Sequence, residues 1–370
     1  MSIRKNTWNL DEHYDLTKDG QNTYSSVDTG SLFMWGRIAA SGGQLAQNDN
    51  VQRSSPTQVP GSWTNNIAYD EFATYALKAD NSFWTWGYSY GELGQNSTVP
   101  YSSPIQIPGT TWSKVGKARG CGFAIKNDGT LWAIGGKNDG GQLGQNSRIS
   151  YSSPRQIPGT QWNFVTGGER QAFALKTDGT LWAWGNNNYG GLCQNNRVGY
   201  SSPVQIPGTW SHISKQNDAN FSGIKTDGTL WKAGYNTYGS QGTNDIAHRS
   251  SPTQVPGTQW DKVEAAQSNI TTATKTDGTL WSWGYNGYGG LGLNDAVGRS
   301  SPTQIPGTQW DKPGPMGATK TDNTIWFWGH NTFGTVGDNS NVPRSSPIQI
   351  PGTWSLIDGN YTNLAIKTGT

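Results

Sequence analysis

Residues 173–184 read FALKTDGTLWAW, and this stretch predicts a β-hairpin. Two short apolar runs flank an Asp-Gly pair, which favours a two-residue turn because both turn positions need a positive φ. Side chains alternate between the two sides of a strand, so Trp182 and Trp184 share one side. Leu181 and Ala183 share the other. The hairpin therefore offers apolar side chains on both of its faces.

The same pattern returns about every 49 residues, and three markers recur in phase. The five-residue strand pattern LWAWG has seven versions, from LFMWG at 32–36 to IWFWG at 325–329. A Ser-Ser-Pro tripeptide also occurs seven times, with its proline at Pro56, Pro104, Pro154, Pro203, Pro252, Pro302 and Pro347. A lone tryptophan shortly after a Pro-Gly pair also occurs seven times, at Trp63, Trp112, Trp162, Trp210, Trp260, Trp310 and Trp354. The chain therefore holds seven copies of one structural unit.

These copies predict an all-β fold, a closed seven-bladed β-propeller. Each copy reads as about four short antiparallel strands, a sheet too small to bury both of its faces alone. Stacking the sheets around an axis buries those faces and leaves only short edges. The chain ends at 363–370, where an LWxWG strand should follow, and that strand stands alone at 28–36. We therefore expect the last blade to be shared between the N- and C-termini.

At this point the repeat resembles the regulator of chromosome condensation repeat family. The family's pattern is a strand ending in FAIKTDGTLWAWG and then GxNxxGQLG, and residues 123–135 and 141–144 match it. The resemblance covers residues 27–370 and implies a seven-bladed propeller that acts as a binding platform. Known relatives include an exchange factor for a small GTPase and secreted inhibitors of β-lactamase, so the family does not assign a partner. Residues 311–320 are about five residues shorter than their siblings, and no exchange-factor hairpin is found, which argues against guanine-nucleotide exchange.

Composition and charge exclude several classes of function. Charged residues make up 14% of the chain and the formal net charge is +2, without a basic cluster, so we expect no nucleic-acid partner. No apolar run is long enough to span a bilayer, so we expect no membrane insertion. Cys121 and Cys193 occupy different repeat positions, which favours two inert thiols over a disulfide.

The sequence offers no set of residues for catalysis, a cofactor or a metal. The four histidines fall in different repeat positions, so they form no ring of ligands. The recurring hairpin aspartates read better as turn formers than as a carboxylate array. The recurring tryptophans read better as core packing than as a surface for stacking carbohydrate. We therefore predict a protein that is not an enzyme and that binds no cofactor.

Residues 1–26 match no repeat and form a predicted N-terminal arm before the propeller at 27–370. The arm carries a few apolar side chains in a polar segment, and their burial needs a host surface. We take these side chains as candidate docking residues: Trp8, Leu10, Tyr14 and Leu16.

Two further sets of residues are candidates for binding a partner. Only arginine or tyrosine precedes each Ser-Ser-Pro, and a stem that covers the proline ring is the favoured explanation, with partner binding as the alternative. This set is Arg53, Tyr101, Tyr151, Tyr200, Arg249, Arg299 and Arg344. The segments between the lone tryptophan and the next strand vary between units, as recognition loops or drifting loops would. From these segments we take Tyr69, Arg119 and Arg170.

These observations favour a non-enzymatic binding or structural propeller. Our first hypothesis is a structural, decoration or host-adhesion component of a phage or other virion, attached through the arm. Its partners would be virion proteins or a host-surface receptor or glycan. It would be assembled in the cytoplasm and act in the virion or outside the cell. The alternative is an intracellular or secreted regulator or inhibitor that caps a partner enzyme with its loops.

Overall fold

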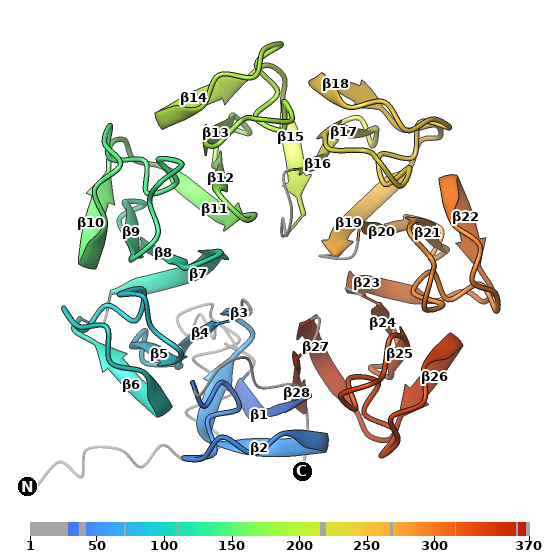
Figure 1. The fold of residues 1–370 in the computed structure, drawn as a ribbon, viewed down its shortest axis with the longest axis horizontal. Helices are drawn as coiled ribbons and strands as arrows, with labels where there is room; N and C mark the ends of the chain where they lie inside the picture. The colour runs from blue at the N-terminus through green and yellow to red at the C-terminus, as the bar shows by residue number, and fades with distance from the viewer. Residues whose placement is uncertain are drawn as a thin grey trace, which may run out of the picture.

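The computed structural model describes residues 29–36, 42–69, 72–109, 111–214, 220–266, 269–314, 316–359 and 362–367. Within these residues every regular element is a β-strand, and the strands form seven four-stranded antiparallel sheets. Figure 1 shows the sheets arranged as blades around a central axis. The predicted all-β, seven-bladed propeller is confirmed.

Each blade runs from an innermost strand at the axis to an outermost strand at the rim. The innermost strands are β3 (Ile67–Tyr69), β7 (Trp112–Ala118), β11 (Trp162–Gly167), β15 (Trp210–Ile213), β19 (Trp260–Ala266), β23 (Trp310–Gly314) and β27 (Trp354–Gly359). The second strands are β4 (Ala73–Leu77), β8 (Cys121–Lys126), β12 (Gln171–Lys176), β16 (Asn220–Lys225), β20 (Ile270–Lys275), β24 (Gly317–Lys320) and β28 (Thr362–Lys367). The third strands are β5 (Phe83–Gly87), β9 (Leu131–Gly135), β13 (Leu181–Gly185), β17 (Leu230–Gly234), β21 (Leu280–Gly284), β25 (Ile325–Gly329) and β1 (Thr29–Gly36). The outermost strands are β6 (Tyr101–Ile107), β10 (Tyr151–Ile157), β14 (Tyr200–Ile206), β18 (Arg249–Gln254), β22 (Arg299–Ile305), β26 (Arg344–Ile350) and β2 (Arg53–Thr64).

One blade is built from both ends of the chain. Its strand order is β2-β1-β28-β27, and β1 pairs with β28 antiparallel from Ser31 opposite Lys367 to Gly36 opposite Thr362. The other blades complete the same hairpin within one stretch of chain, through an Asp-Gly or Asp-Asn turn. The predicted shared blade is confirmed, and it closes the ring.

The hydrophobic core lies between neighbouring blades and is filled mainly by tryptophan. Trp162 and Trp184 pack with the preceding blade, whereas Leu181 and Ala183 pack with the following one. This is the division that strand alternation predicts. All seven lone tryptophans are at most 4% exposed, so the prediction that they form core and not a carbohydrate surface is confirmed.

Tryptophan also links one blade to the next by hydrogen bonds. The indole N–H of Trp184 in β13 donates to the Gln142 carbonyl, which lies in the β9–β10 loop of the preceding blade, at 2.8 Å. A buried indole N–H would otherwise lack a partner, so each such bond fixes the angle between two blades. The same bond occurs elsewhere in the ring, from Trp35 to Thr335, Trp86 to Gln44, Trp283 to Ser240 and Trp328 to Gly290.

The Ser-Ser-Pro marker recurs in every unit because its serines make a second contact between blades. The amide N–H of Asn146 donates to the Ser201 carbonyl of the next blade at 2.8 Å, and the Ser202 hydroxyl donates to the Asn146 side chain at 3.3 Å. Gly141 lies so close that a Cβ there would be 2.8 Å from the Ser201 Cα. Small serines and a glycine are needed because the two backbones touch.

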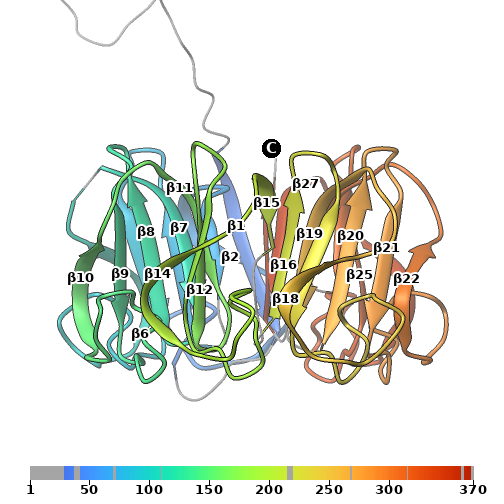
Figure 2. The ribbon, with the colours of Figure 1, turned by 90° about the horizontal axis from the view of Figure 1, so that it is seen from above.

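The propeller has two faces, seen edge-on in Figure 2. We call the hairpin face the one that carries the turns between second and third strands, such as 178–179. There the Asp178 carboxylate accepts hydrogen bonds from the Thr180 amide at 2.9 Å and hydroxyl at 2.7 Å. These bonds lower the pKa of Asp178, and they confirm the prediction that such aspartates form turns. Thr29 and Lys367 lie at this face, because β1 begins and β28 ends there.

The opposite face, which we call the loop face, carries the turns between innermost and second strands and the long loops between third and outermost strands. The two kinds of segment touch, since the Tyr285 amide donates to the Asn269 carbonyl at 3.1 Å. The sixth unit has a shorter hairpin between its innermost and second strands than its siblings, because β23 ends at Gly314 and β24 begins at Gly317. None of the described elements is a helix that could cross a membrane.

Candidate functional site

The four candidate residues of the arm, Trp8, Leu10, Tyr14 and Leu16, lie outside the described residues. The boundary between the arm at 1–26 and the propeller at 27–370 likewise stays a prediction. What the structure adds is the point of entry, because the described chain begins at Thr29 on the hairpin face.

The arginines and tyrosines before Ser-Ser-Pro are not brought together. Each is the first residue of an outermost strand, so the set is spread around the rim with one member per blade. The arginines are already paired within their own units. Arg299 forms an ion pair with Asp295 at 2.6 Å, and Arg249 forms one with Asp245, also at 2.6 Å. The hydrogen bond from Arg249 lowers the pKa of Asp245 to about 2.

The sequence contains a signal for this pairing. An aspartate stands four residues before Arg53, Arg249 and Arg299, whereas serine or asparagine stands four residues before each tyrosine. In one of the tyrosine units the Asn196 amide donates to the Tyr200 hydroxyl at 3.0 Å. The pairs stabilise the long loops, and a role of this set in binding a partner stays a prediction.

Of the three residues chosen from the variable segments, two lie on the loop face and one is buried. Tyr69 is 7% exposed and belongs to the hydrophobic core beside β1. Arg119 lies in the β7–β8 turn and Arg170 follows β11, and both line one pocket of about 420 Å³ between two blades. Two of the residues chosen by comparing the units thus line one pocket, although nothing in their spacing placed them together, and their role in binding a partner stays a prediction.

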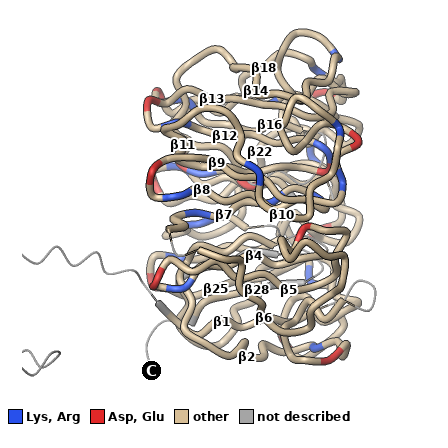
Figure 3. The backbone as a smooth tube through the Cα atoms, turned by 90° about the vertical axis from the view of Figure 1, so that its left-hand side faces the viewer, with Lys and Arg blue, Asp and Glu red and all other residues tan. Residues whose placement is uncertain are grey.

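This first pocket, the charged pocket, is held by two ion pairs that cross between blades. Arg119 pairs with Glu169 at 2.8 Å, and Arg170 pairs with Asp139 at 3.1 Å. The lining contains four cationic side chains, Arg119, Lys137, Arg148 and Arg170, against two carboxylates. The charged pocket is therefore suited to an acidic group on a partner. Elsewhere the two signs of charge are interspersed, as Figure 3 shows for one side of the ring.

A second feature of the loop face was missed in the sequence. The loops after third strands carry exposed tyrosines, and the second aromatic ring of one loop contacts the first ring of the next. Tyr238 meets Tyr285 at 5.2 Å between ring centroids, and Tyr288 meets His330 at 5.0 Å. The exposed rings are Tyr90, Tyr189, Tyr238 and Tyr288, at 38%, 40%, 47% and 57%. The signal was a Tyr-Gly pair shortly after the third strand of these units, which in two of them belongs to a Tyr-Asn-x-Tyr-Gly motif, YNTYG at 235–239 and YNGYG at 285–289.

The asparagine inside this motif holds the loop rigid. Asn286 is 1% exposed, and its side-chain oxygen accepts a hydrogen bond from the Leu291 amide at 2.9 Å. Its side-chain nitrogen donates to the carbonyls of Asp295 and Val297, each at 3.1 Å. The rings of Tyr285 and Tyr288 on either side are therefore presented from a fixed backbone.

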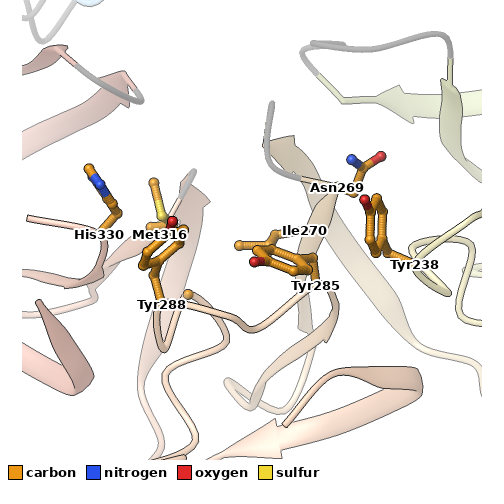
Figure 4. A pocket seen from close by; sticks show the side chains of 8 residues that line it. Tyr238, Asn269, Ile270, Tyr285, Tyr288, Met316 and His330 are labelled. Carbon is orange, nitrogen blue, oxygen red and sulfur yellow. The ribbon is translucent and has the colours of Figure 1, made fainter. Parts of the chain in front are cut away.

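A second pocket, the aromatic pocket, opens among these rings between the blade of β19–β22 and the blade of β23–β26. Its volume is about 330 Å³. It is lined by Tyr238, Asn269, Ile270, Tyr285, Tyr288, Gly290, Met316 and His330, of which Figure 4 labels all but the glycine. Burial lowers the pKa of His330, which favours its neutral imidazole.

Two local features create the aromatic pocket. The β23–β24 hairpin is short, and Met316 in its turn forms part of the lining. Gly290, like Gly191, stands where two other units have Gln44 and Gln142, and a Cβ at Gly290 would lie 2.4 Å from the Ile270 Cδ1 atom. The shortened sixth unit was visible in the sequence, but its effect on the neighbouring blade was not.

Titratable groups elsewhere in the described residues do not assemble a metal site, since no group of three or more His, Cys, Asp or Glu residues comes together there. Cys193 is buried, and this raises the pKa of its thiol well above the usual value. Lys232 is 1% exposed between two blades, where its ammonium donates a hydrogen bond to the Thr271 hydroxyl. Burial lowers the pKa of Lys232 to about 7.

Comparisons with known proteins agree with this architecture. A model of the regulator of chromosome condensation (RCC1) repeat matches residues 128–175, 178–215 and 277–310, and a second model of the same repeat matches 165–190. No curated protein matches the sequence.

Solved structures show the same fold. Human WBSCR16 is similar with a TM-score of 0.78 and 16% identity, covering 91% of this chain and 98% of its own. Prp20p from Saccharomyces cerevisiae, described with its binding properties to Gsp1p and histones, gives 0.79 and 18% identity over 95% of each chain. The repeat models and the closed ring of seven blades lead to one conclusion. The chain belongs to the family of β-propellers built from regulator of chromosome condensation repeats.

Proposed function

We propose that this protein is a non-enzymatic binding propeller that receives a protein partner on its loop face. The observation that carries the proposal is the pair of inter-blade pockets on that face, set in loops that differ between units while the strands stay constant. A rigid scaffold with variable loops is the usual arrangement of a recognition surface. Prp20p, which has the same fold, is described with Gsp1p and histones, and this supports a protein as the partner.

The charged pocket supplies the test of this proposal. Arg119→Ala combined with Arg170→Ala removes two cations at the centre of the pocket. Both arginines form exposed ion pairs, at 39% and 52% side-chain exposure, so the fold should lose little stability. Truncating a central interface arginine costs about 2 kcal/mol or more, so recovery of the partner in a pull-down from native material should fall sharply.

A matched control is Arg155→Ala, which removes an arginine stacked on Tyr151 at the rim. It should leave recovery unchanged. Equal loss of the partner with the control and with the double variant would contradict a site on the loop face.

We further propose that the protein is a structural, decoration or host-adhesion component of a phage or other virion, attached through residues 1–26. Two observations support this. The arm holds Trp8, Leu10, Tyr14 and Leu16 in an otherwise polar segment. The described chain begins at Thr29 on the hairpin face, which is the face opposite the two pockets. On this proposal the protein is assembled in the cytoplasm and acts in the virion or outside the cell.

Deleting residues 1–26 tests the attachment. We expect the deleted protein to keep its melting temperature and to be lost from the particle fraction after gradient centrifugation, because several apolar anchors act together. A lower melting temperature with unchanged incorporation would show that the arm packs on its own propeller. Recovery with one soluble enzyme and no particle would favour the alternative, a regulator or inhibitor that caps that enzyme.

A further inference from the structure

The aromatic pocket differs from the charged pocket in having no charged lining. Its eight lining residues include no aspartate, glutamate, lysine or arginine, and burial favours the neutral form of His330. An anion that entered would lose hydration without meeting an opposite charge. A quaternary ammonium would meet the faces of the tyrosine rings but would leave the hydrogen-bonding groups of the lining unpaired. The lining as a whole therefore favours a neutral ligand.

The same lining combines ring faces with hydrogen-bonding groups. Ile270 and Met316 are buried and supply apolar surface, while three tyrosine hydroxyls, the His330 imidazole and the Asn269 amide surround it (Figure 4). The side-chain oxygen of Asn269 accepts no hydrogen bond from any residue that the structure describes. A hydroxyl donor in the pocket would meet an unsatisfied acceptor.

The hydrogen-bonding groups of the lining discriminate among the neutral ligands that pack on aromatic rings. A proline ring or an aliphatic chain would cover the tyrosine hydroxyls and the Asn269 amide without bonding them, and each unpaired polar group costs about 1–3 kcal/mol. A sugar ring has one face of C–H groups and a rim of hydroxyls, so it satisfies both kinds of surface. The volume of about 330 Å³ lies at the lower end of the range for small-ligand sites.

We infer that the aromatic pocket binds a neutral sugar unit, with a tyrosine ring stacked on the sugar face and the Asn269 amide among its hydrogen-bonding partners. This inference rests on the binding role proposed above and goes further, because it names the chemistry of one ligand. The pocket exists at this blade junction because Gly290 lacks a side chain and the next inner hairpin is short.

The test is saturation-transfer NMR on the purified full-length protein. The probes are the methyl glycosides of glucose, galactose, mannose and N-acetylglucosamine, followed by an array of neutral and charged glycans. We expect binding of at least one neutral sugar, with an affinity that does not change between low and high salt. Tyr288→Ala should weaken this binding by about tenfold, because a ring contact is worth up to ~1.5 kcal/mol.

Gly290→Gln should abolish binding by filling the pocket. The backbone at Gly290 lies outside the left-handed region, and the nearest atom is the end of the flexible Ile270 side chain, so the variant should fold. An unchanged melting curve checks this. The matched control is Tyr189→Ala, which removes the equally placed ring of the blade two before that of Tyr288, a ring that does not line the pocket, and should keep binding within about twofold.

Three results would overturn the inference. The first is the absence of binding to every neutral glycan of the array. The second is an equal loss of binding in the Tyr189 and Tyr288 variants. The third is salt-dependent binding of charged glycans alone, or binding of a proline-rich or trimethyllysine peptide in place of sugars. None of these results depends on capture of a protein partner, so they leave the test of the charged pocket separate.

Discussion

A chain that ends at residue 361, without β28, should not fold to a cooperative domain. β28 is hydrogen-bonded on both sides, to β1 and to β27, so its removal leaves two unpaired edges and opens the ring. It also removes Ile366, which packs with Leu32 in the core. Losing this strand and its blade contacts costs on the order of 10 kcal/mol, which is comparable to the whole stability of a domain.

Circular dichroism and calorimetry measure the outcome, with a chain that ends at Lys367 as the control. The control keeps every residue of β28 and should unfold like the full-length protein. If the chain ending at 361 showed a calorimetric transition of normal enthalpy, the shared blade would not be what holds the ring closed.

Lys232→Met should stabilise the protein by about 3 kcal/mol at pH 7, and most of this gain should vanish by about pH 9.5. The Lys232 ammonium has a single hydrogen-bond partner, Thr271, and forms no ion pair within the described residues. Burial lowers its pKa from 10.5 to about 7. Between these two pKa values the unfolded chain keeps a proton that the folded protein has released. The stability of the natural protein therefore rises with pH through this window, by up to ~1.4 kcal/mol per pH unit, whereas a methionine side chain at this position does not titrate.

Urea denaturation of both proteins at the same two pH values measures the difference. The Thr271 hydroxyl keeps its own bond to the Ser240 carbonyl at 3.0 Å, so methionine leaves no new donor unpaired. Lys232→Arg is the matched variant, because arginine stays charged at both pH values and should destabilise at both. A stability difference between Lys232→Met and the natural protein that is the same at both pH values would show that the amine is not held neutral.

The fold was predictable because residues close in sequence determine the strands and turns of each unit. Neighbouring residues set the hairpin at 173–184, the alternation through Trp184 and the split strand at 28–36. The same pattern occurs in seven copies. The contacts between blades were not predictable in the same way. Ser201 and Asn146 are far apart in sequence, and only the closed ring shows why serine must stand at that place.

The candidate site was harder to predict than the fold, because the exposure of a tyrosine depends on the segments packed around it. Tyr69 and Tyr288 both lie on the side of the ring where the variable segments are, yet one is 7% and the other 57% exposed. The aromatic pocket also needs side chains from three blades, and a gap left by a shortened hairpin is visible only in space. Lys232 is the opposite case. Lys232 occupies the same strand position as Ala183, which alternation assigns to the core. Its burial could therefore have been predicted from the sequence.

The shared blade has a consequence for how the protein is made. β1 leaves the ribosome before its partner β28, which lies far along the chain. At about 5–20 residues per second, the roughly 330 residues between them take on the order of 20–60 s. During this time β1 has an open hydrogen-bonding edge and Leu32 lacks Ile366 as a neighbour. Each nascent chain is therefore open to strand pairing with a neighbouring copy until β28 has been synthesised, and slow or stalled synthesis should raise the fraction that aggregates.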